Sequence, residues 1–381
     1  MKDLDSIASA IAYSYLTPHK PTIALIQTAR QDLSLRAENL YAFDLSKLSP
    51  IHDDLFTIDD LPIVPAELKC NFALVDHNSL LLPWRRSDAK VIGIIDHHDD
   101  EGKHPDANPR AIAVPLGSAA SLVTQTFKDS WTPADAANAP PPELATLLLS
   151  AIYIDTAGLK GSKAEDLDHA SAAFLEAHDT NDPSFGGKKN SVFRVETTKE
   201  LKSRKTSVAH LSSRDLLRRD YKQYVFSTND ENPIIVGLST VPLGLKQWLK
   251  RDPAGFRASL ESWATEHKLD VLGVLTTYNS AHKGNHRREL LILVGGDPTS
   301  GHGQNTVAEA VANALVEGLE SNSVIDLERV ELNGDFEAIE GELGDHVHAK
   351  HAGYVRLWKQ RNTDATRKAI APIFRTILEN V

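Results

Sequence analysis

Short apolar runs that end abruptly at an acidic residue recur in the first half of the chain. Residues 72–75 (Phe-Ala-Leu-Val) lead into Asp76, and residues 91–95 (Val-Ile-Gly-Ile-Ile) lead into Asp96. Runs of this length between turn signals predict strands that are buried on both faces. Segments with helical spacing alternate with these runs, which is typical of a parallel sheet. We therefore expect the first half of the chain to form an α/β domain.

The same patterns predict the other elements of the first half. Strands are expected at about 22–27, 72–76, 91–95 and 111–114. Helices are expected at about 6–16, 118–127, 143–154 and 164–178, with stop signals such as Thr17-Pro18. In an open parallel sheet, ligands bind beyond the carboxyl ends of the strands. The side chains that follow these strands are therefore the first candidates for a site.

The composition changes near residues 184–200, where a Gly-rich stretch is followed by a polar, basic one. We expect a first domain over residues 1–190, a linker over 191–212 and a smaller α/β domain over 213–381. Its predicted strands lie near 233–240, 269–277 and 288–294, and its helices near 243–265, 304–319 and 363–378. Residues 333–353 are expected to form a loop or a hairpin.

The charge balance narrows the possible partners. The chain has 381 residues and a net charge of −11, which argues against a general nucleic-acid coat. Basic residues nevertheless cluster, with eight Lys or Arg between residues 199 and 222. No apolar run has the length of a membrane span and no signal peptide is found, so we expect a cytoplasmic protein without membrane contact. The single cysteine, Cys70, excludes an intrachain disulfide.

An acid followed by histidine comes after two of the predicted strands, at Asp76-His77 and at Asp96-His97-His98. Because neighbouring parallel strands end at the same edge, these side chains are expected to meet there. Carboxylate and imidazole are the ligands that divalent transition metals prefer, and one carboxylate can bridge two ions. A histidine left free could hydrogen-bond a phosphoryl oxygen. For Asp76 alone, a turn-forming role is the alternative.

Further candidates each have a structural alternative. Asp3 and Asp5 stand before the first helix and could cap it or reach a metal. Asp155 ends an apolar run and could be a turn residue or a ligand. Ser118 precedes a helix whose N-terminus could bind an anion, and His104 could be an ordinary surface histidine.

In order and spacing, these motifs resemble the DHH phosphoesterase family. The resemblance is strongest to the fungal cytosolic exopolyphosphatases, with the manganese-dependent (family II) inorganic pyrophosphatases as more distant relatives. It covers nearly the whole chain and rests on residues 3–10, 32–36, 76–78, 93–98, 117–123, 154–156, 202–205, 220–223, 288–290 and 365–368.

The resemblance implies a hydrolase of phosphoanhydride bonds, an exopolyphosphatase that removes the terminal phosphate of inorganic polyphosphate. Its fold would be an N-terminal parallel-sheet DHH domain and a smaller C-terminal α/β DHH-associated domain, with the active site in the cleft between them. It would use two divalent ions, Mn²⁺ or alternatively Mg²⁺ or Co²⁺, to produce a nucleophile from water. The oligomeric state stays open, and a monomer is compatible with the sequence.

The resemblance also implies roles for individual residues. His98 would be catalytic through its contact with the phosphoryl group, and Asp76 would bridge the metals. The metal ligands would be Asp3, Asp5, Asp76, His97 and Asp155. The residues that bind substrate phosphate would be Arg36, His104, Ser118, Lys222, Arg288, Arg367 and Lys368.

The chain departs from the family at its start. In the family, the Asp-x-Asp pair follows a strand, and an Asn or His that faces the metals stands four residues before the first Asp. Only Met1 and Lys2 precede Asp3 here. We therefore expect the first strand and one metal ligand to be missing, as in a truncated sequence.

Three alternatives to the exopolyphosphatase remain. Two are enzymes of the same superfamily, an inorganic pyrophosphatase and a nucleotide or cyclic-nucleotide phosphodiesterase. The third is a metal-impaired DHH protein that acts as a binding module for polyphosphate or a partner.

Overall fold

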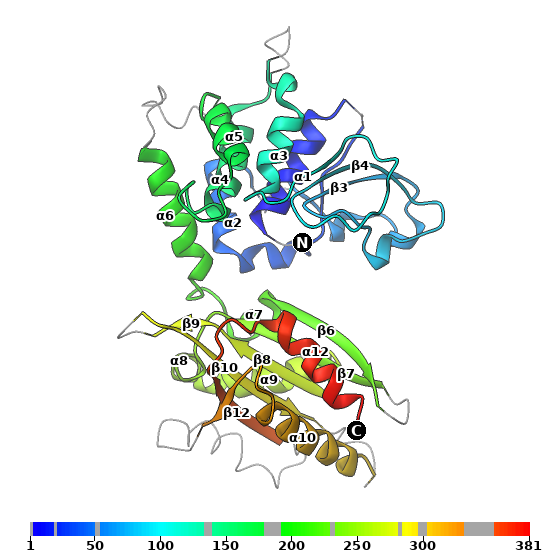
Figure 1. The fold of residues 1–381 in the computed structure, drawn as a ribbon, viewed down its shortest axis with the longest axis vertical. Coiled ribbons are helices and arrows are strands. Elements are labelled where there is room, and N and C mark those ends of the chain that lie inside the picture. The colour runs from blue at the N-terminus through cyan, green and yellow to red at the C-terminus, as the bar shows by residue number, and fades with distance from the viewer. Residues whose placement is uncertain are drawn as a thin grey trace. The chain divides into compact units, whose positions relative to one another are not determined.

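A computed structural model of the chain describes residues 3–18, 21–49, 54–132, 139–178, 192–228, 233–280, 284–295, 303–330 and 354–381. The chain divides into two compact units, unit 1 over Met1–Ser207 and unit 2 over Val208–Val381 (Figure 1). The division falls inside the expected linker, where α6 (Val192–Thr206) packs against the helices of unit 1. The exact domain limits stay a prediction.

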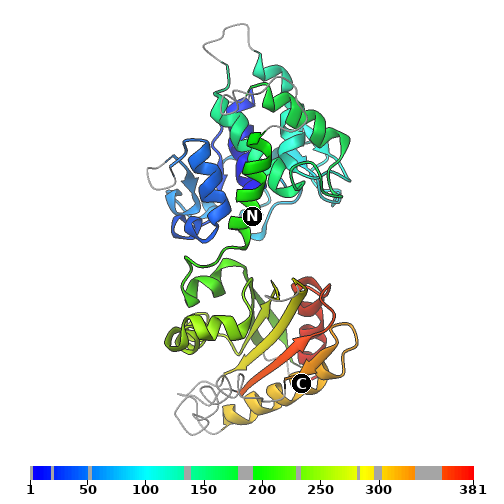
Figure 2. The same cartoon turned by 90° about the vertical axis from the view of Figure 1, so that its left-hand side faces the viewer.

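One almost wholly buried helix organises unit 1. Every residue of α4 (Pro142–Asp155) from Leu144 to Ile154 is buried, because this segment is apolar or small on all sides. The other helices pack around it, side by side as in Figures 1 and 2. They are α1 (Leu4–Leu16), α2 (Ala37–Leu45), α3 (Ala119–Thr126), α5 (Asp166–Glu176) and α6.

The strands of unit 1 are parallel, as the apolar runs predict, but they form two separate sheets. β1 (Leu25–Ile26) pairs with β2 (Phe56–Thr57). β3 (Asn71–Val75), β4 (Lys90–Asp96) and β5 (Arg110–Ile112) form the second sheet in that order. β3 and β4 are confirmed within a residue of their predicted limits, whereas the strand expected at 22–27 keeps only two residues.

A cavity of about 960 Å³ in unit 1 is lined by α1, by β1 and by β3. Among the described residues, β3 has only β4 as a strand partner, so its other edge is open.

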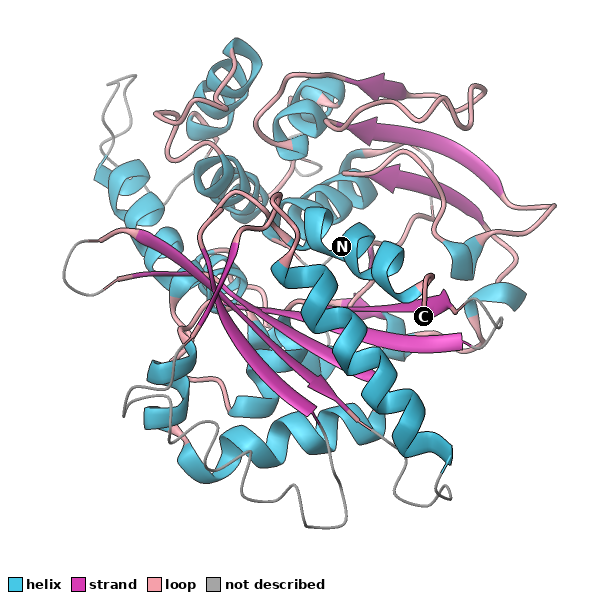
Figure 3. Cartoon of the chain, turned by 60° about the horizontal axis from the view of Figure 1, so that its bottom comes forward, coloured by secondary structure: helices cyan, strands magenta, loops and turns pink. Residues whose placement is uncertain are grey.

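Unit 2 is built on a twisted mixed sheet (magenta in Figure 3). Its strand order is β11-β12-β10-β8-β7-β6, and only the β7–β8 pair is parallel. The strands are β6 (Tyr221–Ser227), β7 (Pro233–Val241), β8 (Val271–Thr276), β9 (Tyr278–Asn279), β10 (His286–Val294), β11 (Leu327–Arg329) and β12 (Tyr354–Gln360). α10 (Gly303–Glu320) and α12 (Arg367–Leu378) share an apolar core with one face of this sheet.

The remaining helices of unit 2 are α7 (Ser213–Arg219), α8 (Leu245–Arg251) and α9 (Pro253–Glu266), of which α7 packs on β7 and α9 on β8. The helix expected over 243–265 is therefore two helices. They break at Asp252, whose carboxylate accepts from the Gly255 amide, followed by Pro253, which has no amide hydrogen to continue α8. Residues 333–353 lie outside the described residues. No helix in the described part of the chain is both long and apolar enough to cross a membrane.

Asp168 joins two parts of unit 1 and gives a test of the fold. Its side chain is fully buried and accepts hydrogen bonds from the Gly117 amide (2.9 Å), the Glu165 amide (2.9 Å) and the Ser121 hydroxyl (2.6 Å). We expect Asp168→Asn to lower the free energy of unfolding by about 3 kcal/mol, because an amide group cannot accept all three bonds. Urea denaturation measures this change. Asp166→Asn, an exposed acid of the same helix, is the control, and equal midpoints for the two variants would contradict the role of Asp168.

Candidate functional site

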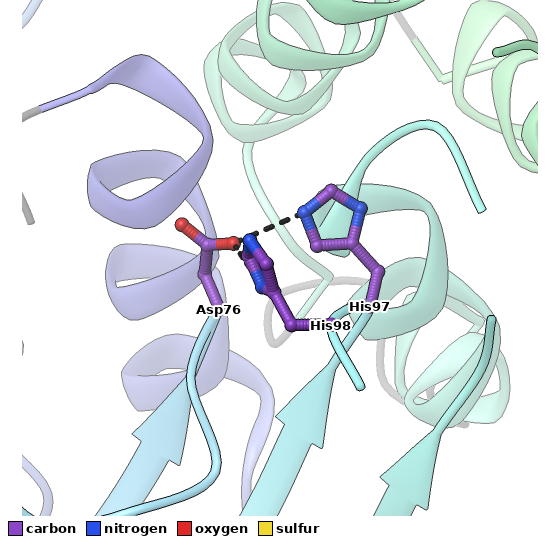
Figure 4. A group of neighbouring side chains, drawn as sticks. All are labelled: Asp76, His97 and His98. Carbon is purple, nitrogen blue, oxygen red and sulfur yellow. Dashed lines mark ion pairs between the residues drawn. The ribbon is translucent and has the colours of Figure 1, made fainter. Parts of the chain in front are cut away.

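Two neighbouring parallel strands bring the acid-histidine motifs together, as the sequence predicts. β3 ends at Val75, β4 ends at Asp96, and the Asp76 amide donates to the Ile95 carbonyl at 2.9 Å. Figure 4 shows Asp76 at the tip of β3 with one carboxylate oxygen facing the neighbouring imidazoles of His97 and His98. The three residues therefore form one cluster at the carboxyl edge of the sheet.

Asp76 is held in an uncommon conformation at this edge. Its φ is +60°, in the left-handed region that residues other than glycine rarely adopt and that recurs at functional sites. Its side chain is almost fully buried. The Ser6 hydroxyl lies within hydrogen-bond distance of Asp76 Oδ2 and also 2.6 Å from Asp3 Oδ1. A hydroxyl has one proton, so it cannot satisfy both carboxylates at once.

His97 is oriented with one nitrogen toward the acids. Its Nδ1 donates to the Leu116 carbonyl at 3.0 Å, which fixes the tautomer and leaves Nε2 for a ligand. Nε2 lies 3.2 Å from Asp76 Oδ1 and 3.7 Å from Asp5 Oδ2. Burial disfavours the charged imidazole, but the hydrogen bond with Asp76 and the charge of Asp5 outweigh it and raise the pKa of His97 to about 9.

His98 is the more exposed histidine, with 57% of its side chain accessible. Its Nδ1 donates to Asp96 Oδ1 at 2.8 Å, and its ring meets that of His97 edge to face. Asp96 is itself fully buried and accepts further bonds from the His97 amide and the Asn78 side chain. This network positions His98 and leaves its Nε2 as the nitrogen that can meet a ligand.

Asp5 enters the cluster from α1 and is clamped by the start of α3. Its carboxylate accepts from the Ser118 hydroxyl at 2.7 Å and from the amides of Ala119 and Ala120 at 2.7 and 2.9 Å. Burial raises the pKa of Asp5 well above its usual range, and the charges of Asp155 and Asp76 add to this. The group that occupies this helix N-terminus is therefore the side chain of Asp5 itself.

Asp155, the last residue of α4, completes the group of acids. Burial raises the pKa of Asp155 to about 6. The positive charge of Lys205 lowers this pKa, and the negative charge of Asp3 raises it further. Lys205 Nζ lies 3.7 Å from Asp155 Oδ1. The structure thus brings together the acids that the sequence analysis names as ligands, although they come from three separate elements, α1, β3 and α4.

The donors of this cluster fit a divalent ion. Ligand atoms of Asp76, His97 and His98 lie within 4.8 Å of one another. Carboxylate and imidazole donors suit Mn²⁺ and similar ions, and a cation would relieve the repulsion between the buried acids. The Ser6 hydroxyl also supports a cation here, because it has one proton for the two carboxylates of Asp3 and Asp76.

Other predicted residues have different surroundings. Asp3 caps α1 through the Ser6 amide, which is the alternative role considered above, while its charge still acts on Asp155. Arg36 precedes α2 and pairs with Glu38 at 3.4 Å, and its charge reaches Asp3. His104 lies in the loop after β4, where Lys103, Arg110 and Arg85 are its charged neighbours. His77, the histidine of the first motif, turns away: its Nδ1 donates to the Val75 carbonyl and it lines the cavity.

The predicted phosphate-binding residues of unit 2 gather at one end of its sheet. Lys222 and Arg288 stand near the starts of β6 and β10, which run in the same direction. Arg367 donates to the Asp220 carbonyl and to Asp220 Oδ1, both at 2.7 Å, just before β6 begins. Arg288 Nε donates to the Thr363 carbonyl at 2.6 Å. Exposed Lys368 follows Arg367 directly, so four cations share this end of the sheet.

Sequence reasoning did not assign a role to three residues of the cluster. Asp96 orients His98, Ser6 joins Asp3 to Asp76, and Lys205 approaches Asp155. A signal existed for Asp96, which belongs to the motif that opens the site. Lys205 lies in residues 202–205, one of the stretches that carry the resemblance, but its partner could not be predicted because the contact joins residues far apart in sequence.

Two family models match the chain. The DHH family N-terminal domain matches residues 1–152, and the DHHA2 domain matches residues 199–377. A "Putative exopolyphosphatase" of Schizosaccharomyces pombe is 30% identical over 395 aligned positions, which cover 100% of this chain and 89% of that protein.

Two further similarities are more limited. A "Probable manganese-dependent inorganic pyrophosphatase" of Streptococcus equi subsp. equi is 31% identical over 180 residues, 45% of this chain and 51% of that protein. A crystal structure of a "putative family II inorganic pyrophosphatase" from Methanococcus jannaschii aligns with a TM-score of 0.47 and 23% identity, covering 76% of this chain and 84% of that one.

The two models follow each other in the order of the two units, and the fungal similarity runs over the whole chain. The acids and histidines of the cluster at residues 3, 5, 76, 97 and 98 all lie within the first match. The chain belongs to the DHH family and carries a DHHA2 domain in its second half.

Proposed function

We propose that the protein is an exopolyphosphatase, a metal-dependent hydrolase that releases the terminal phosphate of inorganic polyphosphate. The observation that carries this proposal is the buried acid cluster around Asp76 and His97, with His98 beside it. The similarity over the whole chain to a protein named an exopolyphosphatase supports the choice of substrate.

The metal ligands we propose are Asp3, Asp5, Asp76, His97 and Asp155, with Asp76 as the shared one. Two divalent ions bound there, Mn²⁺ or alternatively Mg²⁺ or Co²⁺, would supply a nucleophile from water at neutral pH and neutralise charge on the phosphoryl oxygens. His97 is prepared for this role because Leu116 holds its other nitrogen.

His98 is proposed to contact the phosphoryl group. Its Nδ1 donates to the Asp96 carboxylate, which leaves Nε2 as the nitrogen that would donate to a phosphoryl oxygen. The bond to Asp96 also holds the ring in place, so little ordering is needed when substrate arrives. The fixed orientation of His98 would thus stabilise charge that develops in the transition state.

The cations of unit 2 are proposed to bind the polyphosphate chain. Arginine can make two parallel hydrogen bonds to a phosphate, while lysine acts as a compact point charge. Lys222, Arg288, Arg367 and Lys368 provide both types at one end of one sheet. In unit 1, Arg36 and His104 remain proposed phosphate contacts. Ser118, also proposed, contacts Asp5 in the structure. We further propose that the enzyme works in the cytoplasm.

An inorganic pyrophosphatase is the second candidate function. It is favoured by the similarity to a protein named a manganese-dependent pyrophosphatase, which covers 45% of this chain. The two activities differ in how much of an extended anion the protein must bind, so a series of substrates separates them.

The first prediction concerns the metal ligand His97. We expect His97→Ala to reduce Mn²⁺-dependent release of orthophosphate from polyphosphate by more than about a hundredfold, because a ligand of the buried cluster is lost. A colorimetric phosphate assay measures the rate. His169→Ala, an exposed histidine on α5, is the control and should keep wild-type activity. Unchanged activity in His97→Ala would refute the proposed centre.

The second prediction concerns the substrate. We expect phosphate release from long-chain polyphosphate and tripolyphosphate to have a kcat/KM at least about tenfold higher than from pyrophosphate, since several cations of unit 2 can engage a longer anion. Cyclic AMP serves as the phosphodiesterase control and should not be cleaved. A preference for pyrophosphate would replace the proposed function by the second candidate.

The third prediction concerns metal binding itself. Mn²⁺ at one hundred times its Kd should stabilise the protein by about 2.7 kcal/mol, which a rise in Tm reports. Asp76→Asn should abolish most of this rise, because the variant loses a carboxylate of the cluster, whereas Asp129→Asn, an exposed acid, should retain it. A wild-type protein that gains no stability from Mn²⁺ would favour the metal-impaired binding module.

A further inference from the structure

Lys205 stands at the edge of the acid cluster. It lies in the last turn of α6, one helical turn after the fully buried Leu201. It is therefore on the face of α6 that packs against the other helices of unit 1. Its Nζ is 3.7 Å from Asp155 Oδ1. A permanent positive charge of unit 1 therefore approaches a proposed metal ligand directly.

The contact is poorly suited to a purely structural role. The two side chains are 48% and 27% exposed, and pairs this accessible contribute little to stability. α6 is fastened by other contacts: Arg194 forms a buried ion pair with Glu176, and Arg204 lies over the Tyr41 ring at 4.6 Å. The position of α6 thus does not depend on Lys205.

The chemistry around Asp155 gives Lys205 a competitor. Asp155 lies within the electrostatic reach of Asp3, Asp76 and His97. A divalent ion bound by these acids would take the Asp155 oxygen that now faces the ammonium, because a doubly charged ion binds a carboxylate cluster more strongly than a half-exposed lysine does. The ammonium would then lose its contact with Asp155 beside a metal-filled site, on a flexible four-carbon stem.

We propose that Lys205 is a substrate-binding residue supplied by unit 1. Its ammonium holds Asp155 in the metal-free protein, and after a divalent ion takes that carboxylate it binds a phosphoryl oxygen of the substrate. This rests on the proposed function as a phosphoanhydride hydrolase. Lys205 and Asp155 belong to the same unit, so the proposal needs no particular placement of unit 2.

The first experiment titrates Mn²⁺ into the metal-free, full-length protein by calorimetry. Lys205→Ala should bind Mn²⁺ about threefold more tightly or better, because the competing ammonium is gone, and Lys205→Arg should stay close to wild type. Lys199→Ala, which removes an exposed lysine six residues earlier on the same helix, is the matched control and should change nothing. Equal affinities in Lys205→Ala and wild type would overturn the competition.

The second experiment uses the protein saturated with Mn²⁺. Lys205→Ala should raise the KM for tripolyphosphate about tenfold while kcat changes by no more than a few fold, since one charge-assisted hydrogen bond to the bound anion is lost. Binding of inorganic orthophosphate, measured by calorimetry, should weaken in parallel, and Lys205→Arg should restore most of both. An unchanged KM together with unchanged orthophosphate affinity would overturn the substrate role.

The readouts separate this proposal from the proposed function. If the wild-type protein releases no phosphate from any substrate, the proposed function fails, whereas the Mn²⁺ and orthophosphate titrations still decide the role of Lys205. The Tm of each metal-free variant is compared with that of wild type. If Lys205→Ala and Lys205→Arg both unfold well below wild type, Lys205 is a structural residue and the proposal is wrong.

Discussion

The burial of several carboxylates at one sheet edge is the constraint on which the structure of unit 1 depends. Asp5, Asp76 and Asp96 are each at most 3% exposed, and isolated buried charges would be strongly unfavourable. Each acid therefore has its own set of donors. The start of α3 provides for Asp5, His97 for Asp76, and His98 with nearby amides for Asp96. The packing of α1 and α3 against the sheet can thus be understood as the placement of donors around these acids.

The hydrophobic patterns predict an element correctly where the element is buried on one face or on all sides. The apolar runs of β3 and β4 and the apolar segment of α4 are confirmed almost to the residue. β6 is not predicted, because an edge strand with the sequence Tyr-Lys-Gln-Tyr-Val-Phe-Ser carries too few buried positions to reveal its period. α6 is also not predicted, since its composition is polar and basic, and its position depends on contacts with other helices such as the buried ion pair with Glu176. Tertiary contacts decide these elements.

The same distinction applies to the candidate site. The acid-histidine motifs predict the cluster because neighbouring parallel strands end at one edge of the sheet. This rule requires only that each strand be recognised from its own sequence. What the motifs cannot show is which way each side chain turns. His77 follows its strand just as His97 does, yet it faces the Val75 carbonyl and the cavity instead of the acids. Asp5 meets Ser118 and Lys205 meets Asp155 only through folding, so their partners could not be predicted from spacing.

The charge arrangement also implies an order of events at the site. Without ions, the edge that holds Asp3, Asp5, Asp76 and Asp155 is rich in carboxyl groups, and the negative charge of those that are ionised would repel a polyanion. Among the described residues, the cations whose effect on these acids is resolved are few: His97, Lys205 and Arg36. In the proposed enzyme, divalent ions would therefore fill the cluster before a phosphate chain approaches. The contact between Lys205 and Asp155 fits this order, because in the proposal the ammonium would contact an anion only after an ion has taken its place at Asp155.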